Sequence, residues 1–234
     1  MGHEVPGDLI ELYRWHDGCE VVDGPERAQI FPGAQMLPLD EAMTLRGNGI
    51  DAETGWEPGW LPLFAGYEST YWAVDCSMPD PPVIRFDWLD LPEVWRAYDS
   101  LRGMLTAVIA CWSRDAYRQG PQARVEDDPR AVAEIIRSLD SSTPDIDGLV
   151  RGLASADDHV YSQSLGWLRT RLYPEAIPAL IRTLDTETRG RMAAVELLGA
   201  IGGTEALAKL GDLADRDRDA SVRAYARRLL NEPS

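Results

Sequence analysis

The sequence predicts an α+β domain followed by an all-α domain of stacked helix pairs. Two segments between residues 70 and 88 alternate in polarity as half-buried strands do, and a segment from residue 100 on carries apolar residues at helical spacing. From residue 145 on, the chain repeats one motif three times. A chain of 234 residues has room for two ordinary domains, which we place at residues 1–120 and 129–234, with a linker at 121–128.

The first domain should open with a helix over residues 6–17. Leu9, Leu12 and Tyr13 fall on one helical face, and Gly18 is placed to stop the helix. His16 falls on the same face, so we interpret it as a packed histidine. Short apolar stretches follow at 28–38, then a brief helix at 39–46, and the Gly-, Pro- and acid-rich segment 47–62 is predicted to be a loop.

Two strands and a covering helix complete the first domain. The strands are expected at 70–76 and 83–88, and the short loop between them favours an antiparallel pair. Asp99 or Ser100 can cap a helix whose apolar spacing continues to about Arg118. We therefore expect an antiparallel sheet with helices on one side.

The second domain begins with a helix over 129–139 and then repeats itself. Three blocks share the same apolar spacing around a small central residue, and these central residues are offset by 30 and then 32 positions: Ser164, Ala194 and Ala226. An acidic residue precedes each block, at Asp157, Glu187 and Asp219. Partner helices are expected over 146–154, 174–184 and 204–214. A small residue lets the neighbouring helix come close, so the pattern predicts a helical-hairpin solenoid.

These blocks resemble HEAT-like repeats, including the short bacterial kind first named for phycobilisome lyases. The resemblance covers roughly residues 145 to 231, and the third block, D-x-x-V-R-x-x-A-x-x-L-L at 219–230, matches best. The first block departs from the pattern, with Tyr161 and Ser164 where Arg and Ala are usual. Such arrays often offer a concave protein-binding face, and purely structural stacking is the alternative.

The charge is strongly negative and unevenly spread. Of the net −16, residues 1 to 120 contribute −12, from 20 acidic residues and 8 Arg, and residues 121 to 234 contribute −4, from 19 acidic and 15 basic residues. Such a field repels nucleic acid and anionic lipid, so neither is an expected partner. It would speed encounter with a basic protein, and simple solubility is the alternative interpretation.

The remaining composition favours a cytoplasmic protein without a cofactor. No apolar run approaches the roughly 18 to 20 residues of a membrane span, and no basic-then-apolar leader opens the chain. The three cysteines, Cys19, Cys76 and Cys111, lack the paired spacing of zinc or redox sites, so we expect buried free thiols and no metal.

The first domain resembles the SUKH superfamily of SMI/KNR type. The resemblance spans about residues 5 to 118 and rests on an ordered set of motifs: DLIELYRWHDG at 8–18, IFPGAQMLPL at 30–39, WLPLF at 60–64, YWAVDC at 71–76 and SLRGML at 100–105. It implies a non-enzymatic domain that binds proteins. Many bacterial relatives are thought to neutralise polymorphic or contact-dependent toxins, often nucleases, whereas fungal relatives act in cell-wall signalling.

The candidate partner-binding residues combine acid with large aromatic side chains. One group lies in the predicted loop: Asp51, Glu53, Trp56, Glu57 and Trp60. Of the two tryptophans, Trp56 is the better contact candidate, because Trp60 precedes an apolar run and is expected to pack in the core. A second group follows the first helix, where a solvated loop is the alternative: Asp17, Glu20, Asp23 and Glu26.

The sequence carries no strong catalytic signature. It lacks a G-x-S-x-G elbow, a phosphate-cradling glycine loop and an H-E-x-x-H helix, and its histidines are His3, His16 and His159. We expect no enzyme. The leading hypothesis is an immunity protein that blocks a basic toxin domain, and the alternative is a scaffold or regulator of cell-envelope or signalling processes.

Overall fold

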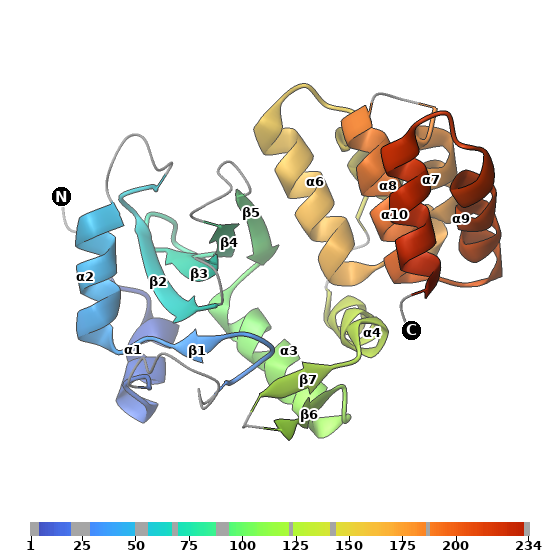
Figure 1. Cartoon of the computed structure of the whole chain (residues 1–234). Helices are drawn as coiled ribbons and strands as arrows, with labels where there is room; N and C mark the ends of the chain where they lie inside the picture. Colours follow the sequence, from blue (N-terminus) through green and yellow to red (C-terminus); the bar gives the residue numbers. More distant parts are fainter. Residues whose placement is uncertain are drawn as a thin grey trace. The chain divides into compact units, whose positions relative to one another are not determined.

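The computed structural model describes residues 5–19, 29–49, 56–66, 70–87, 94–121, 124–140, 144–185 and 188–231. The chain divides into two compact units, Met1–Ile135 and Ile136–Ser234. The first contains an antiparallel sheet with helices, and the second is entirely helical in the part that the structure describes (Figure 1). The predicted fold class is confirmed for both.

A five-stranded antiparallel sheet forms the centre of the first unit. Its strands follow one another in sequence order: β1 Gln35–Met36, β2 Trp60–Ala65, β3 Thr70–Asp75, β4 Val83–Asp87 and β5 Val94–Tyr98. The predicted pair is β3 and β4, with Ala73 opposite Ile84 and Val74 opposite Val83. Strand β2 lies partly within the expected loop, and β5 was not predicted from the sequence.

The helices of the first unit are α1 Gly7–Trp15, α2 Leu39–Gly49 and α3 Leu101–Ser113. Helices α1 and α3 supply Leu9, Met104 and Val108 to a core that also contains Val74 and Val83 of the sheet. Ser100 caps α3 as expected, because its side chain accepts a hydrogen bond of 3.0 Å from the Gly103 amide.

Two helix ends differ from the prediction. Helix α1 ends at Trp15, and His16 beyond it is extended and exposed rather than packed. Helix α3 stops at Ser113, not Arg118, because Asp115 takes the left-handed conformation with φ of 57°. The chain then turns into the short strand β6 Tyr117–Gln119, where Tyr117 is buried.

The segment 121–128, expected as a linker, contains the strand β7 Val125–Asp127, which pairs with β6. Val125 is buried in the core of the first unit, and this packing explains why a polar, proline-containing segment takes a strand conformation. Asp128 then accepts hydrogen bonds of 3.0 and 3.1 Å from the amides of Arg130 and Ala131, which starts helix α4 Pro129–Leu139 where it was predicted. The division between the units falls within α4.

After the end of α4, the described part of the second unit forms three helix pairs. They are α5 Ile146–Gly152 with α6 Asp158–Arg171, α7 Ile177–Thr183 with α8 Thr188–Ile201, and α9 Thr204–Arg216 with α10 Ala220–Asn231, and a 3-10 turn at Pro174–Ala176 precedes α7. The small residues Ser164, Ala194 and Ala226 are all buried, as the repeat pattern predicts. A side chain at Gly152 of α5 would overlap the Ser164 hydroxyl of α6, so these helices approach closely.

Candidate protein-binding surface

Negative charge is concentrated in the first unit. Residues 1–135 hold 24 acidic residues and 10 Arg, a net charge of −14, whereas residues 136–234 hold 15 acidic and 13 basic residues, a net charge of −2. The difference in net charge between the two parts is therefore larger when the chain is divided at the boundary between the structural units. The first unit is the source of nearly all of the protein's negative field.

Several acidic side chains of this unit point into solvent without a cation beside them. Asp40 on α2, Glu57 before β2 and Asp80 between β3 and β4 are exposed, and none has an ion-pair partner among the described residues. Asp8 differs, because its carboxylate lies 2.6 Å from Arg102, and this hydrogen bond lowers its pKa. Asp40 and Asp80 were not predicted as partner-binding residues, because they carry no local signal in the sequence beyond their polarity.

The two tryptophans of the predicted loop are both buried. Trp56 is 5 % exposed and Trp60 is 7 % exposed, and both lie on the sheet face opposite α1 and α3. The Trp56 ring meets Phe86 with centroids 4.6 Å apart and Trp60 with centroids 6.0 Å apart. Core packing of Trp60 is as expected, but Trp56 is an anchor of this second aromatic cluster and not an exposed contact residue.

This anchoring holds Glu57 at the surface. The Trp60 amide donates to the Glu57 carbonyl at 2.9 Å, which closes a turn, and Arg46 of α2 donates to the Pro58 carbonyl at 2.8 and 3.3 Å. Glu57 is exposed between two buried tryptophans. Asp51 and Glu53, the other acidic residues of this predicted group, lie outside the described residues.

Asp17 has a structural role in the second predicted group. Its carboxylate accepts a hydrogen bond of 3.0 Å from the amide of Leu39, the first residue of α2. This caps a helix that begins 22 positions later in the chain, and the helix dipole favours the negative charge. Asp17 remains exposed, and Glu20, Asp23 and Glu26 lie outside the described residues.

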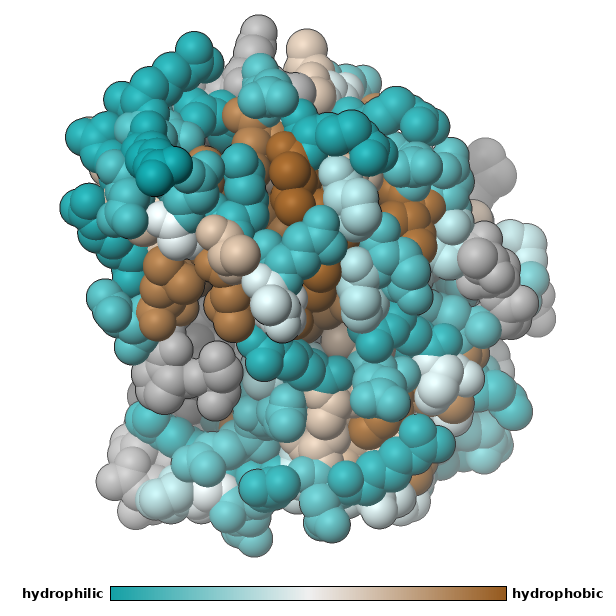
Figure 2. Space-filling model, turned by 90° about the vertical axis from the view of Figure 1, so that its right-hand side faces the viewer, coloured by the Kyte–Doolittle hydropathy of each residue, from teal (hydrophilic) through white to brown (hydrophobic). Residues whose placement is uncertain are grey.

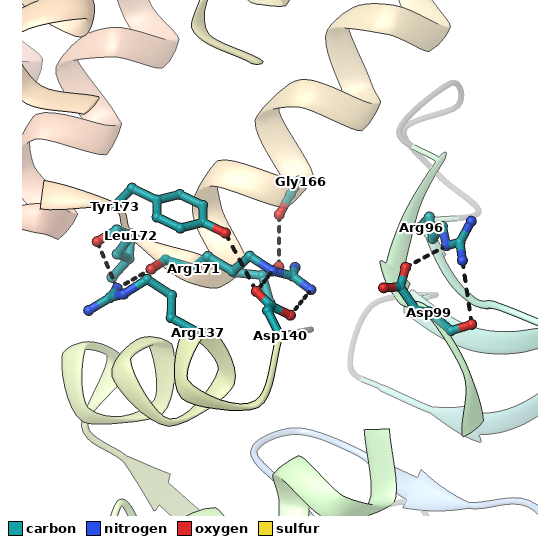
Figure 3. Close-up of polar contacts among 9 residues, drawn as sticks. Arg96, Asp99, Arg137, Asp140, Gly166, Arg171, Leu172 and Tyr173 are labelled. Atoms are coloured by element: carbon teal, nitrogen blue, oxygen red, sulfur yellow. Dashed lines mark hydrogen bonds and ion pairs between the residues drawn. The ribbon is translucent and has the colours of Figure 1, made fainter. Parts of the chain in front are cut away.

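Three acidic residues of the second unit form ion pairs with arginines of the helix stack. Arg171 is 1 % exposed and donates to Asp140 at 2.8 and 3.1 Å (Figure 3). Its guanidinium lies 3.5 Å from the centroid of the Trp167 ring. Arg169 of α6 makes a two-point contact with Glu196 of α8 at 2.6 and 2.8 Å. Arg191 of α8 pairs with Asp217 before α10. The last two ion pairs join consecutive helix pairs, and the first joins α6 to the residue that follows α4.

The surface seen in Figure 2 is mostly hydrophilic, and hydrophobic residues show on it in separate patches. The large hydrophobic residues exposed on α9 and α10 are Leu207 and Leu230, at 42 % and 39 %. Scattered exposed apolar residues of this kind are ordinary on a protein surface. They do not favour one binding face on the last helix pair.

The described residues do not gather into a recognisable catalytic centre. No group of three or more His, Cys, Asp or Glu among them could hold a metal ion. Cys19 Sγ lies 3.7 Å from His16 Nε2 at the surface, while burial raises the pKa of both Cys76 and Cys111. No helix in the described part of the chain is long and apolar enough to cross a membrane.

Comparison with known families divides the chain in the same way. Residues 1–106 match the SMI1 / KNR4 family (SUKH-1), and residues 146–231 match HEAT repeats. No curated protein and no solved structure shows a significant match. The two family matches thus cover the sheet-containing unit up to the start of α3 and all three helix pairs.

Proposed function

Because this chain joins an SMI1/KNR4 (SUKH-1) domain to HEAT repeats, we propose that it is a cytoplasmic immunity protein that binds and neutralises a basic toxin domain. SUKH domains are commonly immunity proteins for polymorphic toxins, and both families are generally non-catalytic. The observation that carries the proposal is the net charge of −14 on the unit that contains the SUKH-1 domain.

The physical basis is electrostatic complementarity. A toxin that acts on nucleic acid needs a positive surface to hold phosphates, and a strongly negative protein is attracted to that surface and can cover it. Exposed carboxylates such as Asp40, Glu57 and Asp80 are available for this because no described cation neutralises them. The HEAT repeats would widen the interface or hold a second protein.

The test is protection against a toxin domain encoded beside this gene. Cells that make the toxin domain alone should die, and cells that also make this chain should grow. The purified proteins should form a complex whose association rate falls as salt is added. Absence of both protection and binding would refute the proposal, and a growth or shape defect on deletion without toxin would then favour the scaffold alternative.

Two variants that remove the same number of negative charges test whether the position of the charge matters. Asp40→Asn, Glu57→Gln and Asp80→Asn together remove three charges from the first unit, and Glu175→Gln, Glu205→Gln and Asp215→Asn remove three from the second. All six side chains are exposed and without ion-pair partners among the described residues. At low salt the first variant should bind about tenfold more slowly, and the second should change the rate by less than about twofold. Equal effects would mean that the position of the charge does not matter.

A further inference from the structure

We infer that the surface shared by the end of α1 and the start of α2 is the site at which this protein docks a cationic, amphipathic segment of its partner. This α1–α2 surface consists of Trp15, Leu39 and Met43 with the carboxylates of Asp17 and Asp40. The inference deepens the proposed function and depends on it only for the identity of the partner.

Three large apolar side chains are exposed here. Trp15 is 77 % exposed, Met43 is 50 % exposed and Leu39 is 40 % exposed. Leu39 and Met43 are one helical turn apart on the outer side of α2. A tryptophan with three quarters of its surface in water is unusual for a side chain of this size, and exposed apolar groups that lie together often mark interaction sites.

Hydrogen bonds join the two separate segments that carry these residues. The chain from Trp15 to Cys19 lies alongside the segment that leads into α2, because the Cys19 amide donates to the Met36 carbonyl at 2.9 Å and the Leu39 amide donates to Asp17 at 3.0 Å. Figure 1 shows α1 and α2 at the same edge of the sheet. The T-shaped contact between the Trp15 and His16 rings, with centroids 5.6 Å apart, orients the indole.

The rim of the surface selects the charge of the occupant. Residues 15–19 and 39–43 carry three acidic residues and no Lys or Arg, so a segment with Lys or Arg on both sides of an apolar side chain is complementary. A second copy of the same surface would bring acid against acid, and an anionic membrane would be repelled. Tryptophan is enriched among residues that dominate binding energy, which makes Trp15 the expected centre of the contact.

The close fit of the backbone at Gly18 keeps the two segments together. Gly18 has φ of 75°, and a side chain there would overlap the backbone of Leu37 and Pro38. The surface is therefore set by the fold before a partner arrives, which reduces the entropy lost on binding.

The first experiment uses a model peptide, so that it does not depend on the toxin. The peptide LKKLLKLLKKLLKL should bind the full chain in calorimetry, and its acidic counterpart LEELLELLEELLEL should not. The double variant Trp15→Ala with Met43→Ala should weaken binding of the lysine peptide by about tenfold or more. The matched control, Ile109→Ala with Met78→Ala, removes two other exposed apolar side chains, at 66 % and 44 %, and should leave binding unchanged. Equal losses in both variants, or no loss in the first, would overturn the inference.

The second experiment repeats the measurement with the toxin domain. Loss of affinity in the α1–α2 variant alone supports the inference. If the toxin domain binds every variant equally, the α1–α2 surface is rejected and the proposed function stands. If the toxin domain fails to bind even the unaltered chain, the proposed function fails and the peptide measurement alone decides on the surface. All four substituted side chains are exposed, and circular dichroism melting checks that each variant folds.

Discussion

The two units differ in how they use aromatic and charged residues. The first is held together by aromatic clusters on its sheet, such as Trp56 with Phe86, and by the guanidinium of Arg85, which lies 5.3 Å from the Trp72 ring and 4.8 Å from the Trp95 ring. In the second unit, ion pairs between arginine and carboxylate side chains join separate helices. The ion pairs among the described residues of the first unit, such as Arg102 with Asp8, lie at the surface, and the exposed carboxylates of Asp40, Glu57 and Asp80 stay available to a partner.

Phe86→Ala should cause the largest loss of unfolding free energy, and this loss should be confined to the first unit. The Phe86 ring is 1 % exposed and contacts the rings of Trp56, Trp60 and Tyr71. Its removal leaves a cavity that costs about 3–5 kcal/mol of unfolding free energy. Urea unfolding followed by tryptophan fluorescence measures the loss. A cost below about 1 kcal/mol would mean that this cluster does not hold the sheet.

Arg171→Met should destabilise the second unit by about 3 kcal/mol, because it leaves the Asp140 carboxylate, which is 17 % exposed, without its cation. Arg182→Met is the matched control. Its ion pair with Asp147 is 3.4 Å long with both side chains more than 60 % exposed, so its loss should cost less than about 1 kcal/mol. Circular dichroism at the helical band follows both. Similar losses in the two variants would show that burial does not set the strength of these pairs.

Sequence periodicity predicted the long elements of both units. Strands β3 and β4, the start of α3, helix α4 and the three helix pairs follow from apolar spacing within each segment. The strands β2, β5, β6 and β7 were missed. Strand β2 contains Pro62 and begins in a glycine-rich segment, and β6 and β7 each have three residues of which only one is buried. Their conformation depends on pairing with distant strands, which no local pattern reveals.

The candidate site was harder to predict than the fold, because exposure depends on tertiary packing. Trp56 lies between glycine and glutamate in the sequence, yet it packs under the sheet against Phe86, thirty positions away. Trp15 and His16 were expected to belong to a longer helix. Helix α1 ends at Trp15, and both side chains are exposed, so His16 leaves the face on which it was expected to pack. The acidic character of the unit, by contrast, is a property of composition and was predictable.

Lowering the pH should change the stability of the two units in opposite directions through one carboxylate in each unit. Burial opposes ionisation of Asp217, but hydrogen bonds from the Asp219 amide and Arg191 outweigh it and lower its pKa below 3.8. Its contribution to stability is therefore present above that value and is lost as the pH falls through the folded pKa. Burial and the neighbouring Asp40 raise the pKa of Glu41 above 4.5, so the first unit gains stability as Glu41 is protonated.

Matched variants test this difference by unfolding at neutral and at acidic pH. At neutral pH, Asp217→Asn should be less stable than the unaltered chain and Glu41→Gln more stable. Both differences should shrink once the pH is below the ordinary carboxylate pKa values. Differences that have the same sign, or that do not depend on pH, would contradict the assignment of these two groups.

The smallest expected effects concern a helix cap in each unit. Asp17 caps α2 from a distant segment, and Asp157 caps α6 locally by accepting from the His159 and Val160 amides at 2.9 and 3.2 Å. Either Asp→Ala change should lower the free energy of unfolding by about 1 kcal/mol. Either Asp→Asn change should lower it by only a few tenths of a kcal/mol, because asparagine keeps the hydrogen-bond acceptor. Binding of the lysine peptide should distinguish the two caps. Asp17→Asn also removes a charge from the α1–α2 surface and should weaken this binding, whereas Asp157→Asn should leave it unchanged. Equal peptide affinities would assign Asp17 to the fold alone.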